Sequence, residues 1–540
     1  MVYSINLFYK FTFKKFWYYT CDCGGMQNEK WRLNIFILAT LIVLPFFGYS
    51  QPDDRFAREH FKKTNYLFAI PEYKTLLKVE RDNADYNYEL ALCLLRTFGD
   101  RTMAIPYLER ACKQTKFPAD AKYQLAIAYT YQNEWDKAVA SMEEYKTKAS
   151  GKDKEKAIKM IEQFQSAKAM TAIPINVTFS NINEVNTEYP DYYPFVTTDE
   201  KFMYFTTRRP ETKTQKQDYD GYYSADSYLS TYDGEKFTFG KNLGNKVNTK
   251  YDDQIVGASG TGELLFFYSN AIETYGALYK LINQSGGWKK EKFIETVEGE
   301  KTIETAGCIN VDENTILFSS NRAGGKGGYD IWMLRKLPNG KWAEPQNLGD
   351  GINTAADEDF PSLQSDGVTL FFSSNVHGGM GGYDLFKTTW NQDDNTYSTP
   401  QNIGYPLNTP YDERTISFGE DGKHAYISAV RPEGKGDLDI YRVTFNDVEY
   451  IPALYQVKLQ NTDTSFTTDA VIVITTEGCE LVGEYRGNVN NKKFTISLKP
   501  GNYNIEIVAE GYAHYVEHLY VNEFAHRLGV IEKVLRLKPE

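Results

Sequence analysis

The first pattern along the chain is helical and covers residues 53–170. Apolar side chains recur there at steps of three and four residues, which places them on one face of a helix. The positions are Leu90, Leu94, Leu95, Leu125, Ala128 and Tyr129. The pattern therefore predicts amphipathic helices, the last of them running from Lys154 to Met170.

This helical segment also repeats itself. Tyr88-Glu-Leu-Ala91 returns 35 residues later as Tyr123-Gln-Leu-Ala126, and Ala104-Ile105 returns after 34 residues as Ala138-Val139. Such a period, with an alanine in each helix, is typical of tetratricopeptide repeats, because small residues let paired helices approach closely. Residues 51–172 are therefore predicted to form tetratricopeptide-like helical repeats, with an unrelated helical bundle as the alternative.

After Ile173-Pro174 the pattern changes to short strands with turn signals, and a longer period appears. The pair Asn-Thr recurs at Asn186, Asn248, Asn353 and Asn408, each followed by acidic residues. The gaps are 62, 105 and 55 residues, so the long gap holds two units, the second starting near Lys301. Gly327-Gly-Tyr-Asp330 likewise returns after 54 residues as Gly381-Gly-Tyr-Asp384.

A period of about fifty residues, made of four short strands, is typical of the blades of a β-propeller. Residues 173–447 are therefore predicted to form a propeller of five blades, with six as the alternative. In the fourth unit the strands are expected at Phe360–Leu363, Thr369–Ser373, Tyr383–Thr388 and Tyr397–Asn402. The last unit has no outer strand of its own, so Ile175–Phe179 is expected to complete its sheet and close the ring.

A last set of strands follows Pro452. Alternating apolar residues and the turn at Lys499-Pro500-Gly501 predict a small antiparallel β-sandwich over residues 448–540. Its strands are expected at Tyr455–Gln460, Ala470–Thr475, Lys493–Leu498, Tyr503–Ala509 and His514–Val521. The predicted fold class is thus multidomain, with helical repeats followed by two all-β domains.

The N-terminal residues predict the cellular location of the protein. Residues 1–25 resemble neither a domain nor a signal, and we interpret them as an upstream misannotation before a start at Met26. Lys30 and Arg32, then an apolar stretch and small residues up to Ser50, predict a signal peptide over residues 26–50, with a short membrane anchor as the alternative. We expect an exported, periplasmic protein that is outer-membrane associated without a lipid anchor, because no Cys sits at the cleavage point.

Charge and cysteine content narrow the functions. A net charge of −12 without a basic cluster excludes a nucleic-acid surface. The cysteines beyond the leader share no CxxC spacing, so we expect no metal site; they are Cys93, Cys112, Cys308 and Cys479. Cys93 and Cys112 are interpreted either as a disulfide or as two buried small apolar residues.

The best candidate site is the set of acids after each Asn-Thr pair, which repetition should array around one mouth of the central channel. These residues are Asp252, Asp253, Asp357, Glu358, Asp359, Asp412 and Glu413. One hypothesis is that they bind a basic partner segment or a cation. The other is that they accept hydrogen bonds from backbone amides of the neighbouring blade. A second acidic set is predicted to cap the third strands, at Asp226, Asp330, Asp384 and Asp439.

Patterns of catalysis are weak in this sequence. The histidines form no HExxH motif, and Gly257-Ala-Ser259-Gly-Thr261 fails the nucleophile-elbow pattern at its last position. The GGKGG and GGMGG segments are expected between two strands rather than before a helix, so they are not phosphate loops. We therefore expect no enzyme activity, no cofactor and no metal.

Three segments resemble known families. PSLQSDGVTLFFSSNVHGGMGGYDLF resembles the TolB-type, WD40-like propeller repeat, and SLKPGNYNIEIVAEGYAHY resembles the carboxypeptidase-regulatory-like sandwich. Together with the tetratricopeptide-like segment, this order resembles the PorE-like envelope proteins of Bacteroidetes in type IX secretion and gliding. Those proteins commonly continue into an OmpA-like domain that binds peptidoglycan, and PorE is a lipoprotein. Neither property is carried over, because this sequence ends just after the sandwich and has no lipid-acceptor Cys; a chain cut short at the C-terminus is one explanation of the first difference.

The sequence thus predicts a non-catalytic protein-binding scaffold of the cell envelope, accessory to type IX secretion or gliding. Its partners are expected to be other envelope proteins, including outer-membrane or secretion-system components. The alternative is a glycan-binding or glycan-processing periplasmic propeller protein.

Overall fold

The computed structural model describes residues 53–540 except 98, 212–216, 219, 271–275, 286, 294–301, 377, 392, 395, 461–468 and 488–492. The predicted misannotated segment and signal peptide lie outside the described residues, as does Lys301. Among the helices in the described ranges, none is long and apolar enough to span a bilayer.

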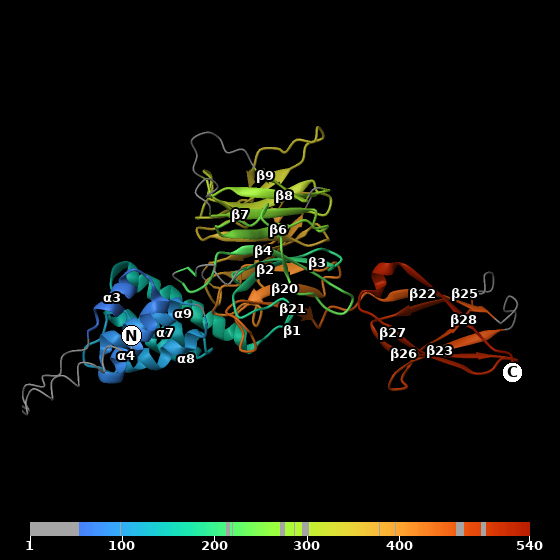
Figure 1. Ribbon diagram of the computed structural model, residues 1–540, viewed down its shortest axis with the longest axis horizontal. Helices are drawn as coiled ribbons and strands as arrows, with labels where there is room; N and C mark the ends of the chain where they lie inside the picture. Colours follow the sequence, from blue (N-terminus) through green and yellow to red (C-terminus); the bar gives the residue numbers. More distant parts are fainter. Residues whose placement is uncertain are drawn as a thin grey trace, which may run out of the picture. The chain divides into compact units, whose positions relative to one another are not determined.

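The described part of the chain begins with seven α-helices, coloured blue to teal in Figure 1. Consecutive helices pack against one another along the whole series. Their bounds are α3 (Arg55–Lys62), α4 (Tyr66–Val79), α5 (Ala84–Arg96), α6 (Ile105–Cys112), α7 (Ala121–Thr130), α8 (Trp135–Lys148) and α9 (Gly151–Ala172).

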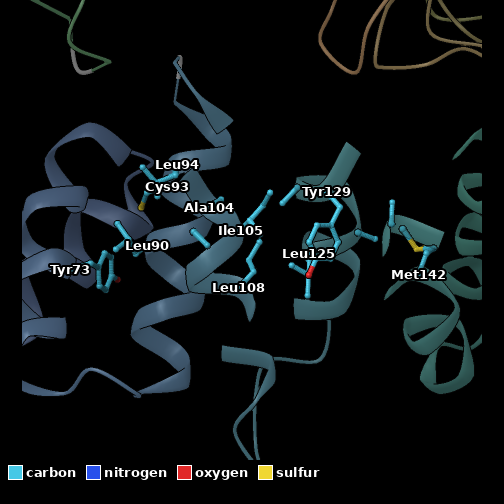
Figure 2. Close-up of a cluster of buried hydrophobic side chains, with 14 of the residues drawn as sticks. Tyr73, Leu90, Cys93, Leu94, Ala104, Ile105, Leu108, Leu125, Tyr129 and Met142 are labelled. Carbon is cyan, nitrogen blue, oxygen red and sulfur yellow. The ribbon is translucent and has the colours of Figure 1, made fainter. Parts of the chain in front are cut away.

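The core of this helical region uses small and large apolar side chains in alternation. Ala91 and its counterpart Ala126 are fully buried, as are Ala104 and Ala138, so the small residues of the repeat occupy equivalent packed positions. Figure 2 shows Leu90, Leu108 and Leu125 among the larger side chains that fill the space between the helices. Alanine at the contact lets two helix backbones approach, and leucine fills the remaining volume.

The cysteines of the helical region are both free thiols. Cys93 is fully buried in the apolar core, and burial raises its pKa to about 12. Cys112 is half-buried and packs against the same core. The sequence left a disulfide and two small apolar residues as alternatives. The structure agrees with the second, because both cysteines are free and pack with the helical core.

Five antiparallel sheets make up the middle of the described chain (Figure 1). Sheet I contains β2 (Asp191–Val196), β3 (Phe202–Thr207), β4 (Asp226–Thr231) and β5 (Lys241–Asn242). Sheet II contains β6 (Asp253–Ala258), β7 (Leu264–Ser269), β8 (Leu278–Gln284) and β9 (Gly287–Lys292). Sheet III contains β10 (Glu304–Ile309), β11 (Thr315–Ser320), β12 (Asp330–Arg335) and β13 (Gln346–Asn347). A helical region followed by propeller-like, β-rich sheets is therefore the architecture.

Sheets IV and V differ from the other three at their outer strands. Sheet IV contains β14 (Glu358–Leu363), β15 (Thr369–Ser374), β16 (Asp384–Asn391), β17 (Thr396–Tyr397) and β18 (Gln401–Asn402). Its outer strand is thus two short pieces, where the sequence predicted one continuous strand. Sheet V contains β19 (Ile416–Phe418), β20 (His424–Ala429) and β21 (Asp439–Phe445), and β1 (Val177–Asn181) completes it. Val177 pairs with Phe445, so the strand expected to complete the last sheet does so.

One backbone hydrogen bond recurs at every contact between successive sheets. The amide at or just before the start of an inner strand donates to a carbonyl just before the third strand of the preceding sheet. The five bonds are Asp191 to Leu438 (2.8 Å), Asp253 to Ala225 (2.7 Å), Glu304 to Gly276 (2.9 Å), Glu358 to Tyr329 (2.7 Å) and Glu413 to Tyr383 (2.7 Å). The first of these joins sheet I to sheet V, so the last sheet contacts the first in the same way as any neighbours do.

The Asn of each Asn-Thr pair clamps the third strand of the preceding sheet. The Asn353 side-chain oxygen accepts from the Ile331 amide at 2.8 Å, and its NH₂ donates to the Ile331 carbonyl at 2.9 Å. A carboxamide carries one donor and one acceptor side by side, as a strand backbone does, which explains the residue type. The same pair of bonds joins Asn186 to Ile440, Asn248 to Ser227 and Asn408 to Leu385.

Glycine is required where the loop before a third strand meets the next sheet. A Cβ added at Gly327 would lie 1.7 Å from the Ala356 carbonyl oxygen, and one at Gly381 would lie 2.3 Å from that of Tyr411. The Asp that ends the repeated motif caps this loop, since Asp330 accepts from the amides of Lys326 and Gly327. As predicted, this second acidic set opens the third strands, at Asp226, Asp330, Asp384 and Asp439.

The C-terminal residues form two further sheets around one core. One has the order β25 (Lys493–Leu498), β22 (Ala453–Gln460), β28 (Val530–Arg536). The other has the order β24 (Leu481–Arg486), β23 (Ala470–Thr476), β26 (Gly501–Ala509), β27 (Tyr515–Val521). The sequence did not predict β24 or β28, and the expectation of an all-antiparallel arrangement is wrong at one pair, because β28 runs parallel to β22.

Candidate functional site at the acidic rim

The predicted acidic residues divide into a buried group and an outer group. The buried group has at most 2% of its surface exposed and consists of Asp253, Glu358, Asp359 and Glu413. In the outer group Asp252 and Asp357 are half-buried and Asp412 is exposed. We call the outer three, at the starts of the inner strands of sheets II, IV and V, the acidic rim.

Most of the buried group holds the turn that leads into its own strand. The Glu358 carboxylate accepts from the Thr354 amide at 2.8 Å and from the Thr354 hydroxyl at 2.6 Å. Asp253 with Thr249 and Glu413 with Thr409 repeat this arrangement. Burial raises the pKa of all three carboxyls. These acids therefore fix the turns of the repeat.

Sheet I contains a fourth acid that holds the turn before its inner strand, and the sequence analysis did not select it. Asp191 accepts from the amide of Thr187 at 2.6 Å and from its hydroxyl at 2.8 Å. It also forms a buried ion pair with Arg209 at 2.5 Å. The signal was present, because Asp191 follows Thr187 by the same four residues that separate Thr354 from Glu358.

Asp359 connects three sheets at the inner end of the rim. Its carboxylate accepts from the Thr305 hydroxyl of sheet III at 2.6 Å and lies 3.7 Å from the Arg414 guanidinium, just before β19 of sheet V. Arg414 in turn lies 3.8 Å from the centre of the Tyr383 ring. This cation therefore balances part of the negative charge of the buried group.

Each carboxylate of the acidic rim accepts a backbone hydrogen bond from the preceding sheet. Asp252 accepts from the Ala225 amide at 2.8 Å, and Asp357 accepts from the Tyr329 amide at 3.0 Å. Asp412 accepts from the Tyr383 amide, also at 3.0 Å. These bonds are the ones expected under the second hypothesis from the sequence, in which the acids accept hydrogen bonds from backbone amides of the neighbouring sheet. They leave room for a binding role only at the exposed side of the same carboxylates.

Aromatic side chains fill the space between the inner strands. Tyr193 of sheet I and Phe360 of sheet IV pack with ring centres 4.6 Å apart, although their sheets are not adjacent in the series. Both residues have a positive φ, 54° and 46°, at irregularities where the inner strand bulges. A bulge re-aims a side chain. Here it directs both rings toward the middle of the sheets.

A polar cavity of about 330 Å³ opens between sheets I and II at the acidic rim. We call it the rim pocket; its lining includes Tyr192, Arg208, Asp218, Asp252, Gln254 and Asn270. The Arg208 guanidinium donates to Asp220 at 2.5 Å, to Asp218 at 3.3 Å and to the Tyr223 carbonyl at 2.8 Å. Burial, with the nearby charges of Asp220 and Asp252, raises the pKa of Asp218 in spite of Arg208.

Of the rim pocket residues, the sequence analysis selected only Asp252. Arg208, Asp218 and Tyr192 carry no repeated motif. The available signal was an insertion, because the first unit spans 62 residues whereas the fourth spans 55. A departure from the repeat marks the place where the sheet contact is not tightly filled.

One group within the described residues brings together three ligand types suited to a metal. Donor atoms of Glu200, Asp421 and His424 lie within 4.8 Å of one another. Glu200 already accepts from the Tyr426 hydroxyl at 2.6 Å, and Arg442 lies 3.8 Å from it. Although burial opposes it, the hydrogen bond to His424 lowers the pKa of Asp421 to about 2. Existing partners therefore account for these carboxylates without an ion.

Comparison with known proteins gives distant structural neighbours alone. No family model matches the chain, and no curated protein matches it. Hydrazine synthase of Kuenenia stuttgartiensis aligns at 10% identity over 63% of this chain and 68% of that one, with a TM-score of 0.27. Puromycin hydrolase aligns at 11% identity over 61% and 52%, again with a TM-score of 0.27. The WD40 repeats of RRP9 align at 8% identity over 50% and 98%, with the same TM-score. Likenesses at this level assign neither a family nor an activity.

Proposed function

We propose that the five sheets are the blades of a closed propeller and that the helices are tetratricopeptide repeats. The five equivalent hydrogen bonds between successive sheets support the ring, since one of them joins sheet V to sheet I. Equivalent burial of Ala91 with Ala126 and of Ala104 with Ala138 supports the helical repeat. The C-terminal sheets, which share one core, fit a carboxypeptidase-regulatory-like sandwich.

We propose that the protein is a non-catalytic protein-binding scaffold of the cell envelope. The observation that carries this proposal is the use of the repeated Asn, Asp and Glu side chains. They join each sheet to the next and so make a rigid frame, which presents the acidic rim as a fixed surface. A preformed surface loses little conformational entropy on association, which suits a scaffold.

Support for the envelope comes from the sequence. The basic, apolar and small residues of 26–50 fit an export signal, and the order of the three regions resembles PorE-like proteins. The partners are accordingly other envelope proteins, including components of the outer membrane or of type IX secretion. Large apolar side chains exposed on α3 and α4 add a second surface, with Phe56 62% and Val79 65% exposed.

Cross-linking in intact cells tests the scaffold proposal. The tagged full chain is purified from envelope fractions, and co-eluting proteins are quantified by mass spectrometry. Asp412→Asn removes a rim charge but keeps an oxygen for the Tyr383 amide, so its melting temperature should stay within about 2 °C of the wild type. We expect a small set of envelope proteins with the wild type and with the exposed control Glu344→Gln, and less of them with Asp412→Asn. Absence of any enriched envelope protein with the wild type would show that the proposal is wrong.

A further inference from the structure

We propose that the rim pocket between sheets I and II receives one positively charged side chain, a lysine or an arginine, from a partner protein. The inference rests on the proposed scaffold function and specifies what that scaffold recognises. Three observations carry it: the charge of the pocket, the unpartnered hydroxyl of a largely buried tyrosine that lines it, and its size.

The charge of the rim pocket is unbalanced among the residues that the structure describes. There the carboxylates of Asp218, Asp220 and Asp252 face one cation, Arg208. That guanidinium is already engaged, since it donates to Asp218, Asp220 and the Tyr223 carbonyl. Two negative charges therefore remain in a partly desolvated site, where an added cation is attracted more strongly than in water.

Tyr192 supplies an independent observation. Its side chain is 8% exposed and lines the rim pocket. Its hydroxyl makes no hydrogen bond to any residue in the described ranges. Polar groups of largely buried side chains usually have a partner, so a ligand in the pocket is the natural one for this oxygen. A bound ammonium or guanidinium would give this oxygen a donor while the carboxylates neutralise the charge.

Size and surroundings decide between a cationic side chain and other occupants. A volume of about 330 Å³ lies at the small end of ligand sites and suits one long side chain with its hydration. A metal ion would need carboxylate oxygens as direct ligands, and both oxygens of Asp252 already accept hydrogen bonds, from the Ala225 amide and the Asn270 side chain. A sugar ring would need an aromatic face, but the Tyr192 ring packs on Tyr193 at 4.7 Å and Arg208 covers Tyr222 at 5.4 Å.

The probe is Nα-acetyl-lysine methylamide, titrated against the full chain by saturation-transfer NMR, with the norleucine analogue as the uncharged control. We expect the lysine compound to bind at least about tenfold more tightly than the norleucine compound. Tyr192→Phe should weaken its binding about threefold to tenfold, and Asp218→Asn about fivefold.

Two substitutions of the same chemistry serve as controls. Tyr520→Phe removes an exposed hydroxyl and Glu344→Gln an exposed charge, and neither should change binding. Because the Tyr192 hydroxyl has no partner to lose among the residues that the structure describes, Tyr192→Phe should leave the melting temperature unchanged. A weaker complex with unchanged stability is a result that a purely structural role does not give.

Four outcomes would overturn the proposal: equal binding of the lysine and norleucine compounds, binding that neither variant weakens, stabilisation by Ca²⁺ alone, or binding of a monosaccharide in place of lysine. The cross-linking experiment separates this proposal from the scaffold function. Partners lost with Asp412→Asn but retained with Tyr192→Phe would contradict the pocket and leave the scaffold. Lysine binding without any captured envelope protein would contradict the scaffold function and leave the pocket.

Discussion

The contact between sheets IV and V and the contact between sheets I and II use the same backbone hydrogen bond, 2.7 Å long in both. At the first contact, glycines bring the loop so close that a Cβ at Gly382 would lie 2.0 Å from the Asp412 carboxylate. At the second, the equivalent segment carries Arg208 and Asp218, and a cavity of about 330 Å³ remains. The comparison teaches that glycine sets how tightly two sheets are filled, while the backbone bond and the Asn clamp set whether they join.

The largest expected effect concerns the part that both contacts share. Asn353→Ala and Asn248→Ala each leave a buried amide of the preceding sheet without a partner and its carbonyl with one donor instead of two, which should cost about 3 kcal/mol of unfolding free energy. Denaturant midpoints measure this cost. A cost below about 1 kcal/mol for Asn248→Ala alone would mean that sheets I and II do not depend on the clamp.

A smaller loss is expected where glycine is needed. Gly327→Ala places a methyl group 1.7 Å from the Ala356 carbonyl oxygen, so the next sheet must move, at about 2 to 3 kcal/mol. Thermal unfolding measures the effect. Gly351→Ala is the matched control, because no atom lies within 4 Å of its added Cβ. Equal melting temperatures for the two variants would contradict the close approach.

The acids that open the third strands at the two contacts, Asp384 and Asp226, should make stability depend on pH. Burial raises the pKa of Asp384 and of Asp226 from 3.8 to about 7. The folded state therefore holds these protons more tightly, and their stabilising effect is complete below pH 4 and is lost as pH rises through 7. Asp384→Asn should thus be more stable than the wild type at pH 8 by about 2 kcal/mol, and near the wild type at pH 5. Unfolding free energies measured at both values test this sign, and Asp226→Asn repeats the test at the other contact.

The smallest effect is expected in the rim pocket itself. Tyr192→Phe should change the unfolding free energy by less than about 0.5 kcal/mol, because its hydroxyl has no partner in the described residues. Tyr426→Phe provides the contrast, since it loses a bond to Glu200 at 2.6 Å and should cost about 1 to 3 kcal/mol. Calorimetric melting of both variants checks the difference. A similar loss for the two would mean that Tyr192 has a structural partner.

Periodic features of the fold could be predicted from the sequence. The Asn-Thr spacing gave the starts of the sheets, and Asp330 and Asp384 gave the starts of the third strands, because identical local geometry needs identical residues. The strand that completes sheet V was predicted from the missing outer strand of the last unit. In each case the sequence signal is a motif within one repeat, or the lack of an element that the other repeats have.

Features that depend on a distant partner could not be predicted. The role of Asn353 needs the backbone of Ile331 in another sheet, and β28 becomes parallel to β22 only when the chain returns across the C-terminal core. The rim pocket is harder still, because Tyr192, Arg208 and Asp218 are brought together by a segment in which the repeat is interrupted. Periodicity identifies what is shared among units, whereas a site belongs to one of them.

The pairing of β1 with β21 has a consequence for synthesis of the chain. Since Val177 must wait for Phe445, no chain that ends before β21 can complete sheet V. Until β21 has been made, β1 has no partner strand, and its unpaired backbone groups can pair with other strands, which is a hazard for aggregation. A chaperone that binds the nascent chain until β21 has emerged should therefore reduce its aggregation.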